Sequence, residues 1–179
     1  MKRSATLYNI IMPVWLLLGF IPYLWPVVLL GNYAVDSLVL YLGMKWIGLA
    51  EKKAFYKAHI GKVWGNGFLG DLPGVLLMLL PTFAQDWLWQ PGSQASQNAL
   101  WHFFHDQLSS LMWNPFETLL GALWALLAVG VSGVCIYWLN RKLVYRHTPL
   151  EPGQAKRLSL LMAALTAPWL FLLPASWMY

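Results

Sequence analysis

Two acidic side chains fall inside long apolar stretches of this sequence, where a charge is costly. Asp36 lies within residues 26–49, and Asp71 lies within residues 60–81. Charged groups at membrane depth commonly mark sites for ions or protons. Two facing carboxylates can bind a hard cation through their oxygens, or hold a proton between them, because two neighbouring negative charges repel each other.

Polar and small residues accompany each acid. Asn32 stands four residues before Asp36, on the same helical face. Residues 61–74 are rich in glycine, and Pro73 removes a backbone donor there. This pattern is compatible with a discontinuous helix, whose freed carbonyls can bind ions. The candidate ion, proton or substrate site therefore consists of Asp36, Asp71, Asn32, Asn66, Gly67 and Gly70.

A purely structural role for the same residues stays open. The acids can be protonated, or bonded to an amide or the backbone, and only hold a pair of helices together. The glycines can serve close helix packing alone.

The composition indicates a membrane protein. Hydrophobic residues make up 59% of the chain and charged residues only 11%, whereas a soluble domain carries about 25% charged residues. The 12 tryptophans suit the headgroup regions of a bilayer. The net charge of +5 does not call for nucleic acid, because the positions of the basic residues account for it.

The apolar stretches predict an all-α, polytopic transmembrane helical bundle with about five spanning helices in one domain, residues 1–179. A tight turn is expected at Pro22–Pro26, where two prolines flank aromatic residues. The first helix is short, so a re-entrant or tilted element remains the alternative for it. The predicted spans are residues 7–21, 26–49, 60–81, 115–139 and 157–177.

Two local signals refine the ends of these spans. Asn114, followed by Pro115, predicts the start of the fourth helix. Pro168 predicts a kink in the fifth helix.

The basic residues predict the orientation. No Lys or Arg occurs between Lys62 and Arg141, an interval that contains the long loop 82–114. Basic loops stay on the cytoplasmic side of a membrane. We therefore expect a protein of the cytoplasmic (plasma) membrane with its N-terminus inside, its C-terminus outside and residues 82–114 extracytoplasmic.

The outer loop carries a second group of polar residues. Residues 98–112 alternate apolar and polar positions at helical spacing, which predicts an interfacial amphipathic helix. His102, His105 and Asp106 share its polar face and are a candidate metal site. The same three residues also fit a plain solvated face or a response to pH.

The fourth predicted helix carries small residues at alternating spacings of four and three. This pattern is typical of a helix that packs closely against another, in the same chain or in a second copy. Cys135 belongs to it and is expected to be a packing residue rather than a nucleophile. The predicted helix-packing seam comprises Gly121, Ala125, Ala128, Ser132 and Cys135.

These observations favour a small membrane transporter or channel, or a subunit of one, for a cation or a proton-coupled solute. A non-catalytic subunit of a larger membrane complex, with an assembly, ligand-binding or regulatory role, is the alternative. Motifs of phosphate loops, zinc proteases, serine hydrolases and dinucleotide binding are absent from the sequence, so we expect no enzyme and no cofactor. An intramembrane aspartyl enzyme, with Asp36 and Asp71 as its acid pair, ranks third, because neither acid lies in a motif of such enzymes. The expected partners are membrane lipids, the transported cation or proton, and further copies of the chain or another membrane protein.

Overall fold

The computed structural model describes residues 22–88 and 99–177, and within these residues the chain is helical and contains no strand. Four of the described helices are long and apolar enough to cross a membrane. These candidate spans are Pro22–Trp46, Lys52–Ala84, Leu119–His147 and Pro152–Leu172. The predicted helical class is confirmed, and the candidate spans are consistent with membrane integration. The predicted span 7–21 lies outside the described residues.

The element order is simple. A short 3-10 turn η1 (Pro22–Leu24) leads into α2, and α3 through α6 follow, with short helical turns after α5 and after α6. The long elements are α2 (Trp25–Trp46), α3 (Lys52–Leu88), α4 (Ala99–Leu108), α5 (Leu119–Leu139) and α6 (Pro152–Thr166). The turns are η3 (Asn140–Val144, a π-helix), η4 (Tyr145–His147), η5 (Trp169–Leu172) and η6 (Ala175–Trp177).

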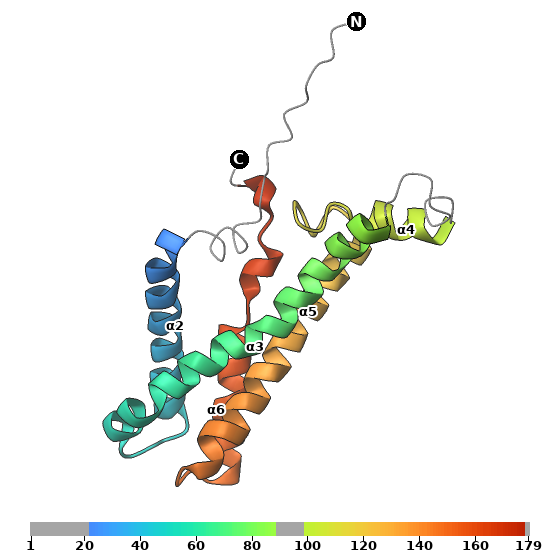
Figure 1. Ribbon diagram of the computed structural model, residues 1–179. Coiled ribbons are helices and arrows are strands. Elements are labelled where there is room, and N and C mark those ends of the chain that lie inside the picture. The colour runs from blue at the N-terminus through green and yellow to red at the C-terminus, as the bar shows by residue number, and fades with distance from the viewer. Residues whose placement is uncertain (1–21, 89–98, 178–179) are drawn as a thin grey trace, which may run out of the picture.

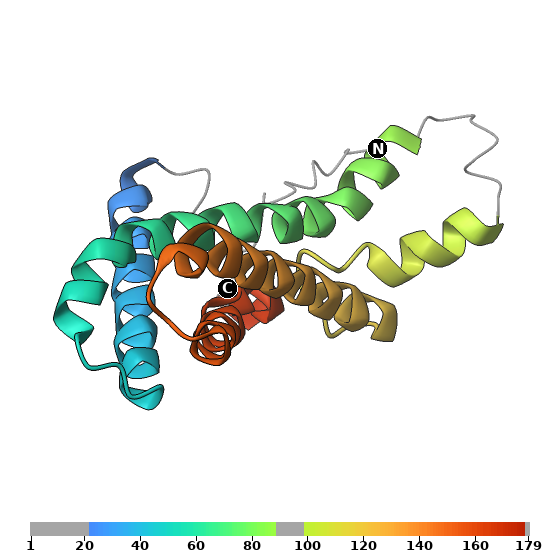
Figure 2. The same ribbon diagram turned by 90° about the horizontal axis from the view of Figure 1, so that it is seen from below.

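The long helices alternate in direction and form a tilted bundle (Figure 1). α3 packs along α5, α6 lies beside α5 and α2, and α4 lies crosswise where α3 ends and α5 begins (Figures 1 and 2). Every Lys and Arg in the described part of the chain lies at the end of the bundle away from α4. These residues are around the α2–α3 and α5–α6 connections or in the first turns of α3. The bundle therefore has one basic end and one end without Lys or Arg among the described residues.

α3 is longer than the predicted span 60–81, and it is not broken. It begins at Lys52, before the predicted span, because Phe55 is buried on one helical face together with Ile60 and Val63. It continues through Pro73 and Pro81 to Leu88. With its 37 residues it is about 56 Å long at about 1.5 Å per residue, which exceeds a hydrocarbon core of about 30 Å. A helix of this length must tilt or protrude.

α5 begins later than predicted. The expected start at Asn114 is wrong, because the Asn114 Oδ1 accepts a hydrogen bond from the Phe116 N–H within a turn, at 3.0 Å. The N-cap is Thr118, whose Oγ1 accepts from the Gly121 N–H at 3.0 Å. The Thr118 hydroxyl also donates to the Gln107 carbonyl, so the same residue ties α4 to the start of α5.

α6 begins earlier and ends earlier than the predicted span 157–177. Glu151 and Gln154 form a capping box, and Pro152 occupies the first turn. The helix stops at Thr166, where the prediction had only a kink at Pro168. A residue before proline is driven into an extended conformation, and Ala167 has φ −57° and ψ 155°. The chain then continues as the 3-10 turns η5 and η6.

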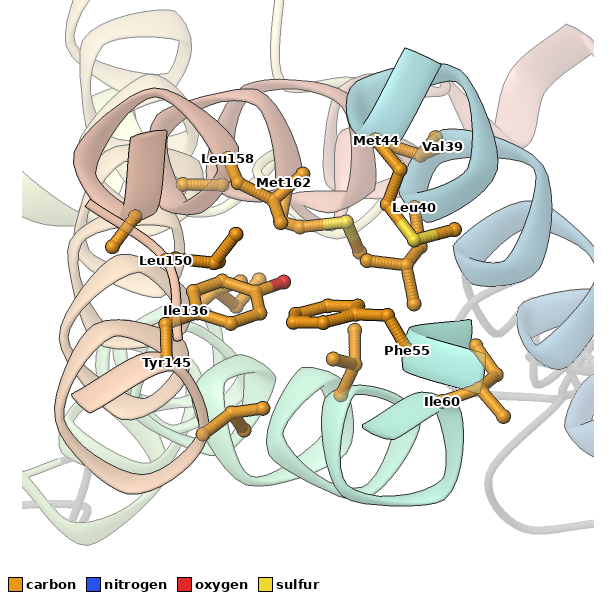
Figure 3. Packing of buried hydrophobic residues seen from close by; sticks show 14 residues of the cluster. Val39, Leu40, Met44, Phe55, Ile60, Ile136, Tyr145, Leu150, Leu158 and Met162 are labelled. Atoms are coloured by element: carbon orange, nitrogen blue, oxygen red, sulfur yellow. The ribbon is translucent and has the colours of Figure 1, made fainter. Parts of the chain in front are cut away.

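Two apolar clusters hold the bundle together. The larger lies at the basic end, where Met44, Phe55, Tyr145 and Met162 pack together from α2, α3, η4 and α6 (Figure 3). The second is nearer the other end and includes Met78, Leu111, Ala125, Ala128 and Phe171. Along α3 and α5 the buried residues between these clusters are small or polar, and this middle layer contains the candidate site. These buried residues are Asn66, Gly67, Gly70, Gly74 and Ser132.

The middle layer is closely packed where α3 meets α5. A Cβ on Gly70 would lie 2.9 Å from the Ile136 backbone nitrogen, and a Cβ on Gly74 would lie 2.8 Å from the Ala128 carbonyl oxygen. The Trp124 Nε1–H donates to the Leu77 carbonyl at 2.8 Å, which fixes the register of the pair. The glycines of α3 therefore allow its backbone to approach α5.

Candidate functional site

A cavity of about 1000 Å³ opens between α2, α3 and residues 165–173. Asp36 and Asp71 both line it, although they belong to different helices. The Asp36 side chain is almost fully buried in the protein, with 5% of its residue surface exposed. The fold thus places the two acids singled out in the sequence on one wall of a space large enough for a ligand.

Gly67 explains how the two acids come together. A Cβ on Gly67 would lie 3.3 Å from the Asp36 Oδ2, so the absent side chain leaves room for the carboxyl group against α3. Asp71 follows Gly67 by four residues and occupies the same helical face.

The carboxyl group of Asp71 is not fully satisfied by the described residues. The Asp71 Oδ1 is buried and has no hydrogen-bond partner in the part of the chain that the structure describes. Buried polar atoms are almost always paired with protein, water or a ligand. An unpaired carboxylate oxygen beside a cavity is what a binding site for a cation or a proton requires, whereas an acid that only locks two helices together would be bonded.

The other predicted site residues divide into two groups. Asn32 lines the cavity together with Gly67, and Asn32 is exposed toward it. Asn66 does not line it: its Nδ2 donates to the Asn140 Oδ1 at 3.4 Å, and both side chains are buried. Gly70 faces Ile136 of α5 and also lies away from the cavity. Asn66 and Gly70 thus have packing positions beside the site.

Two polar features near the site escaped the sequence analysis. Asn140 is fully buried at the start of the π-helical turn η3, whereas a polar residue followed by Arg and Lys suggested an exposed helix end. Next to Asp36, the Ser37 Oγ accepts a hydrogen bond from the Tyr56 hydroxyl at 2.8 Å. Tyr56 thereby links the neighbourhood of Asp36 to the first turns of α3.

The broken membrane helix is α6 rather than α3. Residues 165–168, at the end of α6 and the break that follows, line the cavity opposite the acids. The last carbonyls of a helix lack helical partners and carry partial negative charge. The sequence signal was present at Pro168, but it suggested a kink in a longer helix. The break adds a second electronegative feature to the cavity wall.

The small residues of α5 face the interior of this chain. Gly121, Ala125, Ala128 and Ser132 are buried, and Cys135 is partly buried. Ser132 is packed against Gly74, and its hydroxyl donates to the backbone carbonyl of Asp71 at 3.4 Å. At least this part of the predicted seam therefore supports the helix that carries Asp71.

The outer histidines do not assemble a metal site. No group of three or more His, Cys, Asp or Glu side chains suited to a metal ion occurs within residues 22–88 and 99–177. On α4, His102 and Asp106 are exposed, and His105 stacks on Trp101 with its Nδ1 3.4 Å from the Asp106 Oδ1. The described structure therefore does not assemble the predicted metal site from these three side chains.

No known protein family matches this chain, and no curated protein or solved structure gives a significant match to it. The function must accordingly be argued from the residues of the site.

Proposed function

We propose that this protein is a small membrane transporter or channel, or a subunit of one, for a cation or a proton-coupled solute. The observation that carries the proposal is the placement of Asp36 and Asp71 on one cavity, with a buried carboxylate oxygen of Asp71 left without a partner among the described residues. Two acids at membrane depth are costly, and a bound cation or proton offsets that cost.

The electrostatics of the cavity support a positively charged occupant. Among the described residues, its lining contains Asp36 and Asp71 and no Lys, Arg or His. The end of α6 contributes the negative end of a helix dipole to the lining of the same cavity. A cation is attracted by all three features, whereas an anion would be repelled by each of them.

The orientation follows from the basic end of the bundle. We place this end, with the α2–α3 and α5–α6 connections, in the cytoplasm, because basic loops remain on that side. α4 then lies at the extracytoplasmic face of the cytoplasmic membrane. In this arrangement the cavity opens nearer the outer half of the bundle, since α2 and α6 line it with residues toward their outer ends.

An assembly of several chains fits the exposed surface. Within the most apolar window of each candidate span, between 22% and 39% of the residues are buried. The remaining surface is available to lipid, to further copies of the chain or to another membrane protein. A subunit role in a larger complex is the second candidate function on this observation. Recovery of a stable stoichiometric partner would favour it, and cation flux by the purified chain alone would count against it.

The proposal is tested by flux in liposomes that contain the purified protein. The variants Asp36→Asn and Asp71→Asn keep the size of the side chain and remove its charge. Glu117→Gln is the matched control, because Glu117 is exposed in the turn before α5. We expect flux of Na⁺, K⁺ or H⁺ to fall in both Asp variants and to be retained in the control. Equal flux in all four proteins would refute the assigned site.

A further inference from the structure

The cavity is much larger than an inorganic cation requires. Its volume is about 1000 Å³, whereas a water molecule occupies about 30 Å³ in the liquid. Pockets for small organic molecules measure roughly 300 to 1,000 Å³. A small ion held by two carboxylates would leave most of this space empty, so the size of the cavity indicates an organic ligand.

The walls indicate the chemistry of that ligand. Most lining residues are aliphatic or aromatic, and the aromatic ones include Trp25, Trp64, Phe68 and Trp169. The Trp64 and Phe68 rings meet edge to face with centroids 5.4 Å apart. The faces of such rings attract cations, most strongly when water is excluded. Apart from the indole groups, the polar side chains of the lining are Asn32, Asp36, Asp71 and Thr166.

The Thr166 hydroxyl and one of the indole groups, that of Trp169 in η5, already donate hydrogen bonds to carbonyl groups of α6. The Thr166 hydroxyl donates to the Met162 carbonyl at 2.8 Å, and the Trp169 Nε1–H donates to the Ala164 carbonyl at 3.0 Å. The cavity therefore offers a ligand the carboxyl groups of Asp36 and Asp71, the exposed Asn32 side chain, and the Trp64 Nε1–H, which has no partner among the described residues; the two carboxyl groups are its charged groups. An apolar space with negative charge at one wall is complementary to a molecule with an apolar body and one positive centre.

We infer that the cavity binds an amphipathic organic cation, with its apolar body against the aromatic and aliphatic walls and its positive centre beside Asp36 and Asp71. The exposed α2 residues Leu29, Asn32 and Val35 belong to the wall, so the cavity is open on that side within the described part of the chain. This inference rests on the proposed function and names its substrate class.

Binding to the purified full-length protein in detergent tests the inference. The probes are methyltriphenylphosphonium, which carries a positive charge, and triphenylphosphine oxide, which is neutral and has the same triphenylphosphorus body. Calorimetric titration, corrected with protein-free micelles, gives the affinity of each. We expect saturable binding of the cation to the wild-type protein, at least about tenfold tighter than binding of the neutral compound. Equal affinities for the cation and the neutral compound, or no saturable binding of the cation, would overturn the inference. This test needs the wild-type protein alone.

Variants then place the probe in the cavity. Asp36→Asn and Asp71→Asn are each expected to weaken binding of the cation by at least about tenfold, and Glu117→Gln to leave it unchanged. Each variant is compared only when it elutes as a single peak at the wild-type volume. Binding that is equally tight in well-behaved Asp36→Asn and Asp71→Asn variants would place the probe elsewhere and overturn the assigned site.

Flux measurements separate this inference from the proposed function. Asp-dependent flux of inorganic cations, without binding of the phosphonium probe, would overturn the organic substrate and leave the transporter proposal standing. Asp-dependent binding of the probe, with no movement of the probe, inorganic cations or protons across the liposome membrane, would support the binding site and contradict transport by the chain alone.

Discussion

Replacing Gly70 by alanine distinguishes a packing role of this glycine from a role in binding. The new Cβ would lie 2.9 Å from the Ile136 backbone nitrogen and 3.1 Å from its Cα. These are main-chain atoms, so a side-chain rotation cannot relieve the overlap. Ordinary van der Waals contact begins at 3.4 Å. The backbones of α3 and α5 must therefore separate by about 0.5 Å at this point.

The cost can be estimated against a matched glycine on the same helix. Alanine is favoured over glycine by about 1 kcal/mol within a helix, and this gain applies equally to both positions. A Cβ on Gly65 would meet nothing within 4 Å, so Gly65→Ala carries the gain alone. Overpacking costs typically about 1–3 kcal/mol. We therefore expect Gly70→Ala to be less stable than Gly65→Ala by about 1–3 kcal/mol.

Unfolding by SDS in mixed micelles, followed by circular dichroism or tryptophan fluorescence, measures this difference. Flux should fall in Gly70→Ala as well, because Asp71 is next to Gly70 on α3 and the contact between α3 and α5 must widen there. Gly70→Ala and Gly65→Ala of equal stability would refute the close contact between α3 and α5. Wild-type stability combined with lost flux would instead favour a direct role of Gly70 in the site.

Three further predictions concern the surroundings of the site. Asn66→Leu should destabilise the protein by about 1–3 kcal/mol in SDS unfolding, because it removes the donor to the buried Asn140 Oδ1. An Asn66→Leu/Asn140→Leu variant that recovers none of this loss would contradict the pairing. In a Cys135→Ser background, an impermeant maleimide should label Thr82→Cys in intact cells and spare Lys53→Cys, since Lys53 lies at the basic end. Labelling of Lys53→Cys but not of Thr82→Cys would contradict the proposed orientation. Light scattering in mild detergent should give a protein mass above the 20.4 kDa of one chain; a monomer that conducts cations would exclude the expected assembly.

The sequence was informative where a residue type has few uses in a membrane. Asp36 and Asp71 could be singled out because charge is rare and costly at that depth, and the structure places both on one cavity. The one-sided distribution of Lys and Arg predicted a basic end, which the described bundle shows. Both predictions depend on single-residue chemistry, which can be argued without knowledge of the packing.

The sequence was less informative where neighbouring helices decide the outcome. Pro73 suggested a break in α3, but that helix is continuous and Gly70 and Gly74 hold it against α5. Pro168 suggested a kink, and there the helix ends, because Ala167 is extended. Whether a proline bends or ends a membrane helix depends on the partners that satisfy the freed backbone groups. The cavity itself could not be foreseen, since it is formed by residues far apart in the sequence.

The most direct test of the central claim is a double-mutant cycle on flux with wild-type protein, Asp36→Asn, Asp71→Asn and the double variant. If the two carboxylates form one site on the cavity, each single change should lower flux by at least roughly tenfold, and the double variant should be no slower than the slower single variant. Two losses that multiply would indicate independent sites. Unchanged flux in the double variant would contradict the account.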